Sequence, residues 1–366
     1  MTVLDATPKS RFRFADENRI PRIVKVWLLT GLIMILFQIM IGGVTRLTGS
    51  GLSITRWEIV TGSIPPLNAA QWQEAFDLYR ATPQYHKINT GMSLGDFKFI
   101  YFWEYFHRLW ARLMGLVFIF PFFWFLWKGM LSRRLTMRLL VVVSLAALEG
   151  FFGWIMVASG LIYRPWVNAY NLTLHLVTAL VIYTYLLCTI FIAYHPGRPI
   201  WPHNRWRRLG WGILGLLFVQ LALGALMSGT KAGLFYPTWP DQGGTFLPQV
   251  LLDGANWKAE NFVNYDQHPF MPALVQFFHR NTAYLLLGLI IYLAVGTRGL
   301  STSADFRTAV RLMLVALAGQ IALGIVTVLQ FQGQIPVLLG VLHQMGAVLL
   351  LTAVSYTAYQ MKQRST

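Results

Sequence analysis

The chain has 366 residues, of which 55 % are hydrophobic and only 12 % are charged, and its formal net charge is +16. About a quarter of the residues in an ordinary soluble domain are charged, so this composition excludes a disordered chain and a water-soluble globule and indicates an integral membrane protein. The single cysteine, Cys188, excludes a disulfide framework and a cysteine-held zinc or iron–sulfur centre.

Eight apolar windows of about 20 residues, the length that crosses a hydrocarbon core of about 30 Å, predict eight membrane-spanning helices. In chain order they are expected at about 26–46, 100–127, 139–158, 170–193, 210–229, 273–296, 309–331 and 339–359. No small-residue cleavage site follows the first window, so we interpret it as a retained span and not as a signal peptide. The predicted fold class is an all-α integral membrane protein.

The basic residues predict the orientation of these spans. Nineteen of the 30 Lys and Arg residues fall in the N-terminal arm, the C-terminal tail and the connections after the second, fourth and sixth spans. Because inward-facing loops are enriched in Lys and Arg, both termini are expected on the cytoplasmic side, or in the matrix of a mitochondrion. Topology and anionic lipid then explain the positive charge, and nucleic acid is not an expected partner.

The two halves of the chain repeat one another. Residues 38–52 align without gaps on residues 220–234. The further matches are Trp57 with Trp239, Phe106-His107-Arg108 with Phe278-His279-Arg280, and Leu174-His175 with Leu342-His343. Each half has four spans and begins on the same side, so the repeat is parallel and predicts two pseudo-symmetric four-helix bundles. The expected units are an arm (1–25), a first half (26–193), a linker (194–209), a second half (210–359) and a tail (360–366).

Each odd-numbered span carries Gln or Glu four residues before a glycine. The four pairs are Gln38 and Gly42, Glu149 and Gly153, Gln220 and Gly224, and Gln320 and Gly324. We expect the glycines to allow close helix packing, and the polar side chains to hydrogen-bond a neighbouring helix. Glu149 is the exception, because a carboxyl group in lipid is costly and tends to be protonated, paired or functional.

One histidine lies near the outer end of each even-numbered span. The four are His107, His175, His279 and His343. Each is about five to seven residues from that end, so at 1.5 Å per residue all four are predicted roughly 7–11 Å below the outer boundary. Imidazole ligates iron well, and helical bundles hold cofactors between facing helices, so we predict one bis-histidine haem in each half. Zinc is less favoured because neither pair has a third ligand.

Charged residues near the histidines suggest further roles. Arg46, Arg108, Arg280 and Lys231 are candidates for pairing with haem propionates, with ordinary snorkelling to the interface as the alternative.

Residues i and i+3 of a helix share a face, so Glu104 should lie beside His107, and Gln276 beside His279. Only the first half thus has an ionisable acid at this position. We therefore expect a reactive site there, with Glu104 as its catalytic group, and a permanent electron-carrying haem in the second half. The alternative is that Glu104 orients a ligand or pairs with Arg108.

On these residues the chain resembles the haem A synthase family. The motifs that carry the resemblance are residues 42–53, Trp57, Gly62, Pro65-Pro66, residues 104–108, the His175 span, residues 276–280 and His343-Gln344. The resemblance implies oxidation of the C8 methyl group of haem O to a formyl group, by successive hydroxylations and loss of water, to give haem A for cytochrome c oxidase. It implies haem b on His279 and His343, substrate haem O on His107 and His175, and an essential Glu104.

The first outer loop lacks the cysteine pair that some bacterial members carry, so the chain resembles the alphaproteobacterial and mitochondrial branch. Acidic residues in the arm, Asp5, Asp16 and Glu17, are unlike a transit peptide and favour a bacterial inner membrane. No Gly-x-Gly-x-x-Gly fingerprint opens a soluble domain, so electrons should come from a ferredoxin-like protein or from quinol. The other expected partners are haem O synthase and membrane lipid, and the chain could form a homo-oligomer.

Two other functions are compatible with the four histidines. A dihaem protein that exchanges electrons with quinol would need them equally, but it does not explain why Glu104 stands opposite Gln276. A haem transporter or chaperone fits the parallel repeat, but the sequence shows no paired broken helices at the middle of the membrane.

Overall fold

The computed structural model describes residues 15, 20–56, 64–160, 164–194, 201 and 203–361, and within these ranges it contains helices and no strand. Eight of its helices are long and apolar enough to cross a membrane, which confirms the eight predicted spans. They are α1 (Arg22–Leu47), α4 (Leu94–Trp127), α5 (Arg133–Gly160), α6 (Ala169–Tyr194), α7 (Asn204–Gly229), α11 (Phe270–Gly296), α12 (Ala304–Leu329) and α13 (Val337–Gln360). The predictions that involve Trp57 and Gly62, and most of the arm and the tail, lie outside the described residues.

Several helices begin earlier than their apolar windows. Helix α5 begins at Arg133, where the window begins at 139, and α4 begins at Leu94, where the window begins at 100. A hydropathy window stops at the first charged turn, but helical hydrogen bonding continues through it. At the start of α4, Ser93 and Asp96 form a reciprocal capping box, which fixes where that helix begins.

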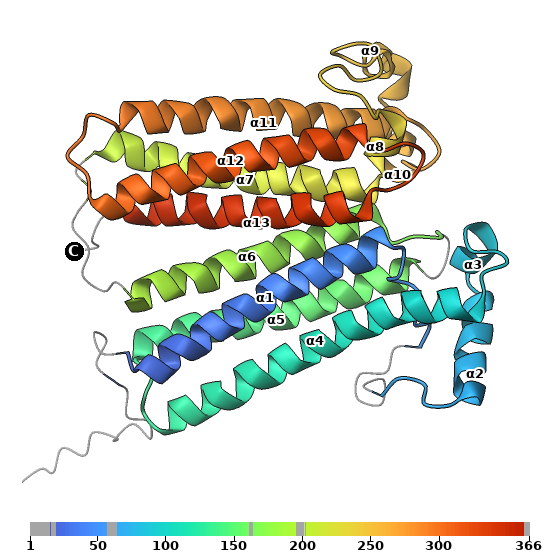
Figure 1. The fold of residues 1–366 in the computed structure, drawn as a ribbon, viewed down its shortest axis with the longest axis horizontal. Coiled ribbons are helices and arrows are strands. Elements are labelled where there is room, and N and C mark those ends of the chain that lie inside the picture. The colour runs from blue at the N-terminus through green and yellow to red at the C-terminus, as the bar shows by residue number, and fades with distance from the viewer. Residues whose placement is uncertain are drawn as a thin grey trace, which may run out of the picture.

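The helices are arranged as two matching groups (Figure 1). In the first half, α1 packs against α4 and α6, and α5 packs against α6. In the second half, α7 packs against α11 and α13, and α12 packs against α13. The two sets of contacts correspond helix by helix under the repeat, so the expected pair of pseudo-symmetric bundles is confirmed. The halves meet where α6 contacts α7 and where α13 contacts α1 and α6.

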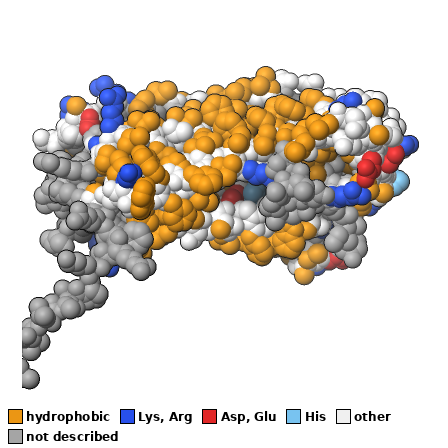
Figure 2. Space-filling model, turned by 90° about the horizontal axis from the view of Figure 1, so that it is seen from below, with side chains coloured by type: hydrophobic (Ala, Val, Ile, Leu, Met, Phe, Trp, Pro, Cys, Tyr) orange, Lys and Arg blue, Asp and Glu red, His pale blue; other side chains and the backbone are white. Residues whose placement is uncertain are grey.

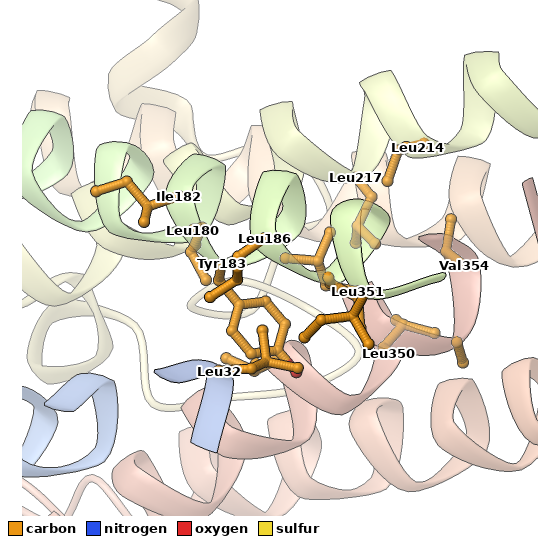
Figure 3. Close-up of a cluster of buried hydrophobic side chains, with 14 of the residues drawn as sticks. Leu32, Leu180, Ile182, Tyr183, Leu186, Leu214, Leu217, Leu350, Leu351 and Val354 are labelled. Atoms are coloured by element: carbon orange, nitrogen blue, oxygen red, sulfur yellow. The ribbon is translucent and has the colours of Figure 1, made fainter. Parts of the chain in front are cut away.

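Apolar side chains fill the seam between the halves. Figure 3 shows Leu180, Tyr183 and Leu186 of α6 beside Leu217 of α7 and Leu351 of α13. These side chains are buried, so the seam is held by close packing of branched and aromatic groups. The surface that faces away from the seam is also rich in exposed apolar side chains, as lipid contact requires (Figure 2).

The two long loops lie at one end of the bundle, here called the loop end, and the C-terminus lies at the other (Figure 1). The first loop contains α2 (Ala69–Arg80) and α3 (Pro83–Lys87). The second contains α8 (Ala232–Phe235), α9 (Gln249–Leu252), a 3₁₀ turn (Gly254–Asn256) and α10 (Ala259–Val263). Phe76, Tyr79 and Tyr85 pack on Phe97 and Ile100 of α4, which fixes the first loop over its own half.

The repeat extends to the backbone at the ends of α1 and α7. Gly49 has φ +71°, and Lys231, which the alignment places opposite it, has φ 53°. The residues before them, Thr48 and Thr230, each donate a side-chain hydrogen bond to the carbonyl four residues earlier, at 2.7 and 2.8 Å. A left-handed conformation favours glycine, so Lys231 adopts it because the second half keeps the backbone path of the first.

Candidate functional site

Each of the four span histidines contacts the Gln or Glu of the preceding membrane-spanning helix. Gln38 Nε2 lies 3.2 Å from His107 Nδ1, Gln220 Nε2 lies 3.2 Å from His279 Nδ1, and Gln320 Nε2 lies 3.1 Å from His343 Nδ1. In the remaining pair, Glu149 Oε1 lies 2.9 Å from His175 Nδ1. A polar contact between a histidine and a Gln or Glu side chain thus occurs four times in the structure.

The glycine of each pair faces the same histidine. An added Cβ at Gly42 would lie 3.0 Å from Cε1 of His107, and one at Gly324 would lie 2.9 Å from Cε1 of His343. The corresponding distances at Gly153 and Gly224 are 3.1 and 3.3 Å. The glycines do allow close packing between helices, as expected, but their neighbour in every case is an imidazole ring.

Sequence analysis did not connect these patterns. The signal was present, because the four Gln/Glu–Gly pairs and the four histidines alternate along the chain, one per helix. Gln344 was named in the sequence only as part of the family motif, and the structure gives it a contact: its Nε2 donates to the carbonyl of Ile39 at 2.7 Å and so links α13 to α1 across the seam.

Within each half the two histidines lie on helices that pack against the same neighbour. His107 on α4 and His175 on α6 belong to helices that both contact α1, and His279 on α11 and His343 on α13 belong to helices that both contact α7. Among the described residues, no three His, Cys, Asp or Glu side chains gather as a metal centre of several protein ligands requires. Each half therefore offers two imidazoles, which is the ligand set of an iron whose other ligands come from a porphyrin.

The hydrogen-bonding atoms near the histidines fit such a ligand. Oε1 of Gln38, Gln220 and Gln320 is buried and has no hydrogen-bond partner within the described part of the chain. Amide oxygen and nitrogen positions are interchangeable by a 180° rotation. After this rotation each Oε1 can accept a proton from either ring nitrogen, because the amide lies almost equally far from Nδ1 and Nε2, at 3.2 and 3.3 Å for His107, 3.2 and 3.4 Å for His279, and 3.1 and 3.4 Å for His343. The ring nitrogen that is not bonded to the amide is then available to a metal.

Glu104 joins the first long loop to α4. Its side chain is buried, with 2 % of the residue exposed. Oε2 accepts hydrogen bonds from the backbone N–H groups of Ser53 and Ile54, at 2.7 and 2.8 Å, and from the Ser53 hydroxyl at 2.8 Å. Oε1 forms an ion pair with Arg108. Four charge-assisted contacts hold the carboxylate in one place at the loop end.

Gln276 occupies the equivalent place in the second half and is fully buried. Its Nε2 donates to the carbonyl of Tyr236 at 2.9 Å, and the repeat aligns Tyr236 with Ile54. Both residues therefore tie the loop to the helix at the same position, but Glu104 does so as an anionic acceptor and Gln276 as a neutral donor. Arg280 donates to the carbonyls of Thr238 and Asp241, so it too holds the second loop.

Arg46 and Lys231 meet at the loop end of the seam. Arg46 Nη2 donates to the carbonyl of Ser228 at 2.8 Å, and its Nε is buried without a hydrogen-bond partner among the described residues. Lys231 Nζ lies 3.6 Å from the centre of the Trp166 ring. Burial, and then repulsion from Arg46, lowers the pKa of Lys231 to about 8, while Asp266 opposes the shift. Two neighbouring cations at the loop end are suited to bind an anionic group of a ligand.

A cavity of about 380 Å³ opens beneath the first long loop. Its lining includes Ser53, Pro65 and Tyr101, together with Arg108 and Arg112 of α4. Sequence analysis named Arg108 but missed Arg112, which lies one helical turn further along. In the space-filling view, the face formed by the first half is hollowed near its middle, and acidic and histidine side chains are visible there (Figure 2).

Comparisons with known proteins agree over nearly the full length of the chain. Residues 25–355 match the family model described as cytochrome oxidase assembly protein. A protein of Rhodopseudomonas palustris is 41 % identical over 355 residues, which cover 96 % of this chain and 90 % of the relative. One of Bradyrhizobium sp. is 39 % identical, with 93 % and 92 % covered, and one of Nitrosospira multiformis is 38 % identical, with 93 % and 94 % covered. All three relatives are named heme A synthase.

Proposed function

The chain belongs to the cytochrome oxidase assembly protein family that contains these heme A synthases, and we propose that it is itself a haem A synthase. It is a multi-pass membrane oxidoreductase that converts the C8 methyl group of haem O into a formyl group. The product is haem A, which cytochrome c oxidase requires. The conversion is an oxidation by successive hydroxylations and loss of water, for which dioxygen would be the oxidant and a partner would supply the electrons that reduce it. His279 and His343 would hold the haem b that carries those electrons.

We assign the two haems to the two halves. His279 and His343 hold haem b as a resident group, and His107 and His175 hold the substrate haem. The observation that carries this assignment is the contrast between Glu104 and Gln276 at equivalent places, because oxidation of a carbon requires protons to be moved as well as electrons. The cavity beneath the first long loop also supports it, since a substrate must be able to enter and leave its site.

The protein's own groups supply binding, orientation and charge, and the haem iron supplies the redox chemistry. The Gln and Glu partners contact each imidazole and would orient it toward a bound haem. Glu104 lies one helical turn from His107 and fixes the first loop to α4 through Arg108 and the donors of Ser53 and Ile54. Arg46, Arg108, Arg280 and Lys231 are proposed propionate partners. Arg108 and Arg280 each directly follow a proposed histidine ligand, and Arg46 and Lys231 lie at the loop end of the seam.

The cellular setting follows the same proposal. The acidic residues of the arm, Asp5, Asp16 and Glu17, favour a bacterial inner membrane, and the basic loops favour both termini in the cytoplasm. Haem O synthase supplies the substrate, and a ferredoxin-like protein or quinol supplies the electrons.

The test is to express the chain in a host that lacks its own haem A synthase, with and without haem O synthase, and to separate the extracted haems by chromatography. We expect haem A only when haem O is supplied. A dihaem electron-transfer protein would instead contain haem b alone under both conditions, and that result would overturn the proposal.

A further inference from the structure

Glu149 stands where the other three odd-numbered spans carry glutamine. Its Oε1 lies 2.9 Å from Nδ1 of His175, and the two side chains are 17 % and 20 % exposed. We propose that Glu149 is a positioning residue that makes His175 a stronger, more anionic ligand than the other three histidines. The haem of the first half is then harder to reduce than the haem of the second. This inference rests on the proposed binding of a haem by His107 and His175.

Packing does not explain the carboxylate. Gly153 approaches His175 as closely as the other glycines approach their rings, so the local geometry is the same in all four places. Gln38, Gln220 and Gln320 reach their histidines with a neutral amide at 3.1 to 3.2 Å. A glutamine would therefore fill the position of Glu149 without placing a charge in a membrane span, where a charge is costly.

The contacts of Glu149 direct its charge to the histidine. Glu149 Oε2 and His175 Nδ1 are both buried and have no hydrogen bond among the described residues, and the ion pair found for the carboxylate is the 2.9 Å contact between Oε1 and Nδ1. Glu104, which is the acid beside His107, differs in this respect because Arg108 and three donors from the loop surround it. Among the described residues no Lys or Arg pairs with Glu149, so the imidazole receives the effect of its charge.

The effect on the bound iron depends on which group accepts the Nδ1 proton of His175. When Nε2 faces a metal, Nδ1 carries the proton and donates it to the neighbouring group. A carboxylate attracts that proton more strongly than an amide oxygen does, which gives the ring partial imidazolate character and raises its basicity. A more basic axial ligand stabilises ferric over ferrous iron. Electrons from a donor thus collect first on the haem of the second half, whose two histidines both have amide partners.

The repeat provides a reciprocal pair of variants. Glu149 and Gln320 occupy equivalent positions on α5 and α12, so Glu149→Gln gives the first half the neutral pattern and Gln320→Glu gives the second half the charged one. Both changes keep side-chain size and a hydrogen-bonding partner for the histidine, so a purely structural role would survive them.

The experiment is an anaerobic titration with dithionite of the full-length protein, purified with haem b and loaded with haem O, followed by visible spectroscopy. Dithionite supplies one electron to each ferric iron. The wild type should show two one-electron steps, and His107→Ala should lack the one at lower potential. Glu149→Gln should make that lower step easier by on the order of tenfold in the ratio of ferrous to ferric iron, or about 59 mV. Gln320→Glu should shift the other step in the opposite direction.

The outcomes separate this inference from the proposed function. Two haems with an unchanged titration in both variants would overturn the role of Glu149 and leave the proposed function intact. If Glu149→Gln does not fold, an unmoved upper step in Gln320→Glu overturns the inference equally. Failure of the wild type to bind haem O beside haem b would instead remove the proposed function, and this inference with it.

Discussion

The two halves of the molecule share a framework but differ in charge. Both place two histidines between four helices, both set a glycine against each imidazole ring, and both tie a long loop to the helix of the first histidine. In the first half, however, Glu104 and Glu149 stand where the second half has Gln276 and Gln320. Glu has an oxygen where Gln has an amide NH2 group, so the halves can keep the same geometry while only the first carries acids at these two positions.

This comparison suggests how a repeat acquires two roles. The shared framework binds the same kind of group twice, because the histidine contacts hardly vary from site to site. The two acids then make one copy suited to chemistry, and their absence leaves the other suited to electron storage. Substitutions that exchange these acids and amides should make the two halves more alike. Substitutions that remove a histidine or a glycine of the shared framework should weaken haem binding in one half.

The largest effect is expected from loss of a ligand in the second half. His343→Ala should remove the stably bound b-type haem and abolish haem A formation, since the resident haem delivers the electrons. His86→Ala is the matched control, because His86 is exposed in the first long loop. Haem content is measured from the reduced spectrum of the purified proteins. Full haem b in His343→Ala would show that this histidine is not a ligand.

The next largest effect concerns the acid of the first half. Glu104→Gln should fold and keep haem b, but it should accumulate haem O or a partly oxidised haem instead of haem A. Positioned acid–base groups contribute about 10²- to 10⁴-fold to rates, so little product should form.

Ser53→Ala is the control for Glu104, because it removes one hydrogen bond to the carboxylate and keeps its charge. It should cost on the order of tenfold or less if the charge is what matters. Chromatography of the extracted haems gives the answer. Near-normal haem A formation by Glu104→Gln would show that Glu104 anchors the loop and is not catalytic.

A smaller effect is expected at the glycines. Gly324→Ala places a Cβ 2.9 Å from the ring of His343, so it should weaken haem b retention by about 1–3 kcal/mol. Gly319→Ala lies on the same helix with nothing within 4 Å of its added Cβ, so it should leave haem retention unchanged. Competition for haem by an external haem-binding protein compares the two variants. Equal retention would mean that the ring does not need this glycine.

The smallest effect is expected at the cations of the loop end. Arg46→Ala should weaken haem retention more than Arg56→Ala, because Arg46 is buried at the seam while the Arg56 side chain is 61 % exposed and paired with Glu74. Exposed ion pairs contribute little, so Arg56→Ala should behave like the wild type. The haem-to-protein ratio after gel filtration measures the difference, and equal ratios would remove the reason to assign Arg46 to a propionate.

The sequence predicted the spans, the repeat and the four histidines because each has a one-dimensional signal: hydropathy, self-alignment and position within a span. It did not reveal that Gln38 and Gly42 belong to His107, because that contact joins residues 69 positions apart and depends on the rotation of two helices. Arg112 was missed for a similar reason, since a cavity is formed by a loop that folds back over a helix. The ligand roles of the histidines and the catalytic role of Glu104 stay predictions.

The assignment of the resident haem to the second half and of the substrate to the first is tested most directly by reduced-haem spectra of three proteins. These are the wild type, His107→Ala and His279→Ala, each purified after expression with a supply of haem O. We expect His107→Ala to keep the b-type spectrum and to contain no haem A, and we expect His279→Ala to lose the b-type spectrum. A b-type spectrum that survives in His279→Ala but disappears in His107→Ala would contradict the assignment.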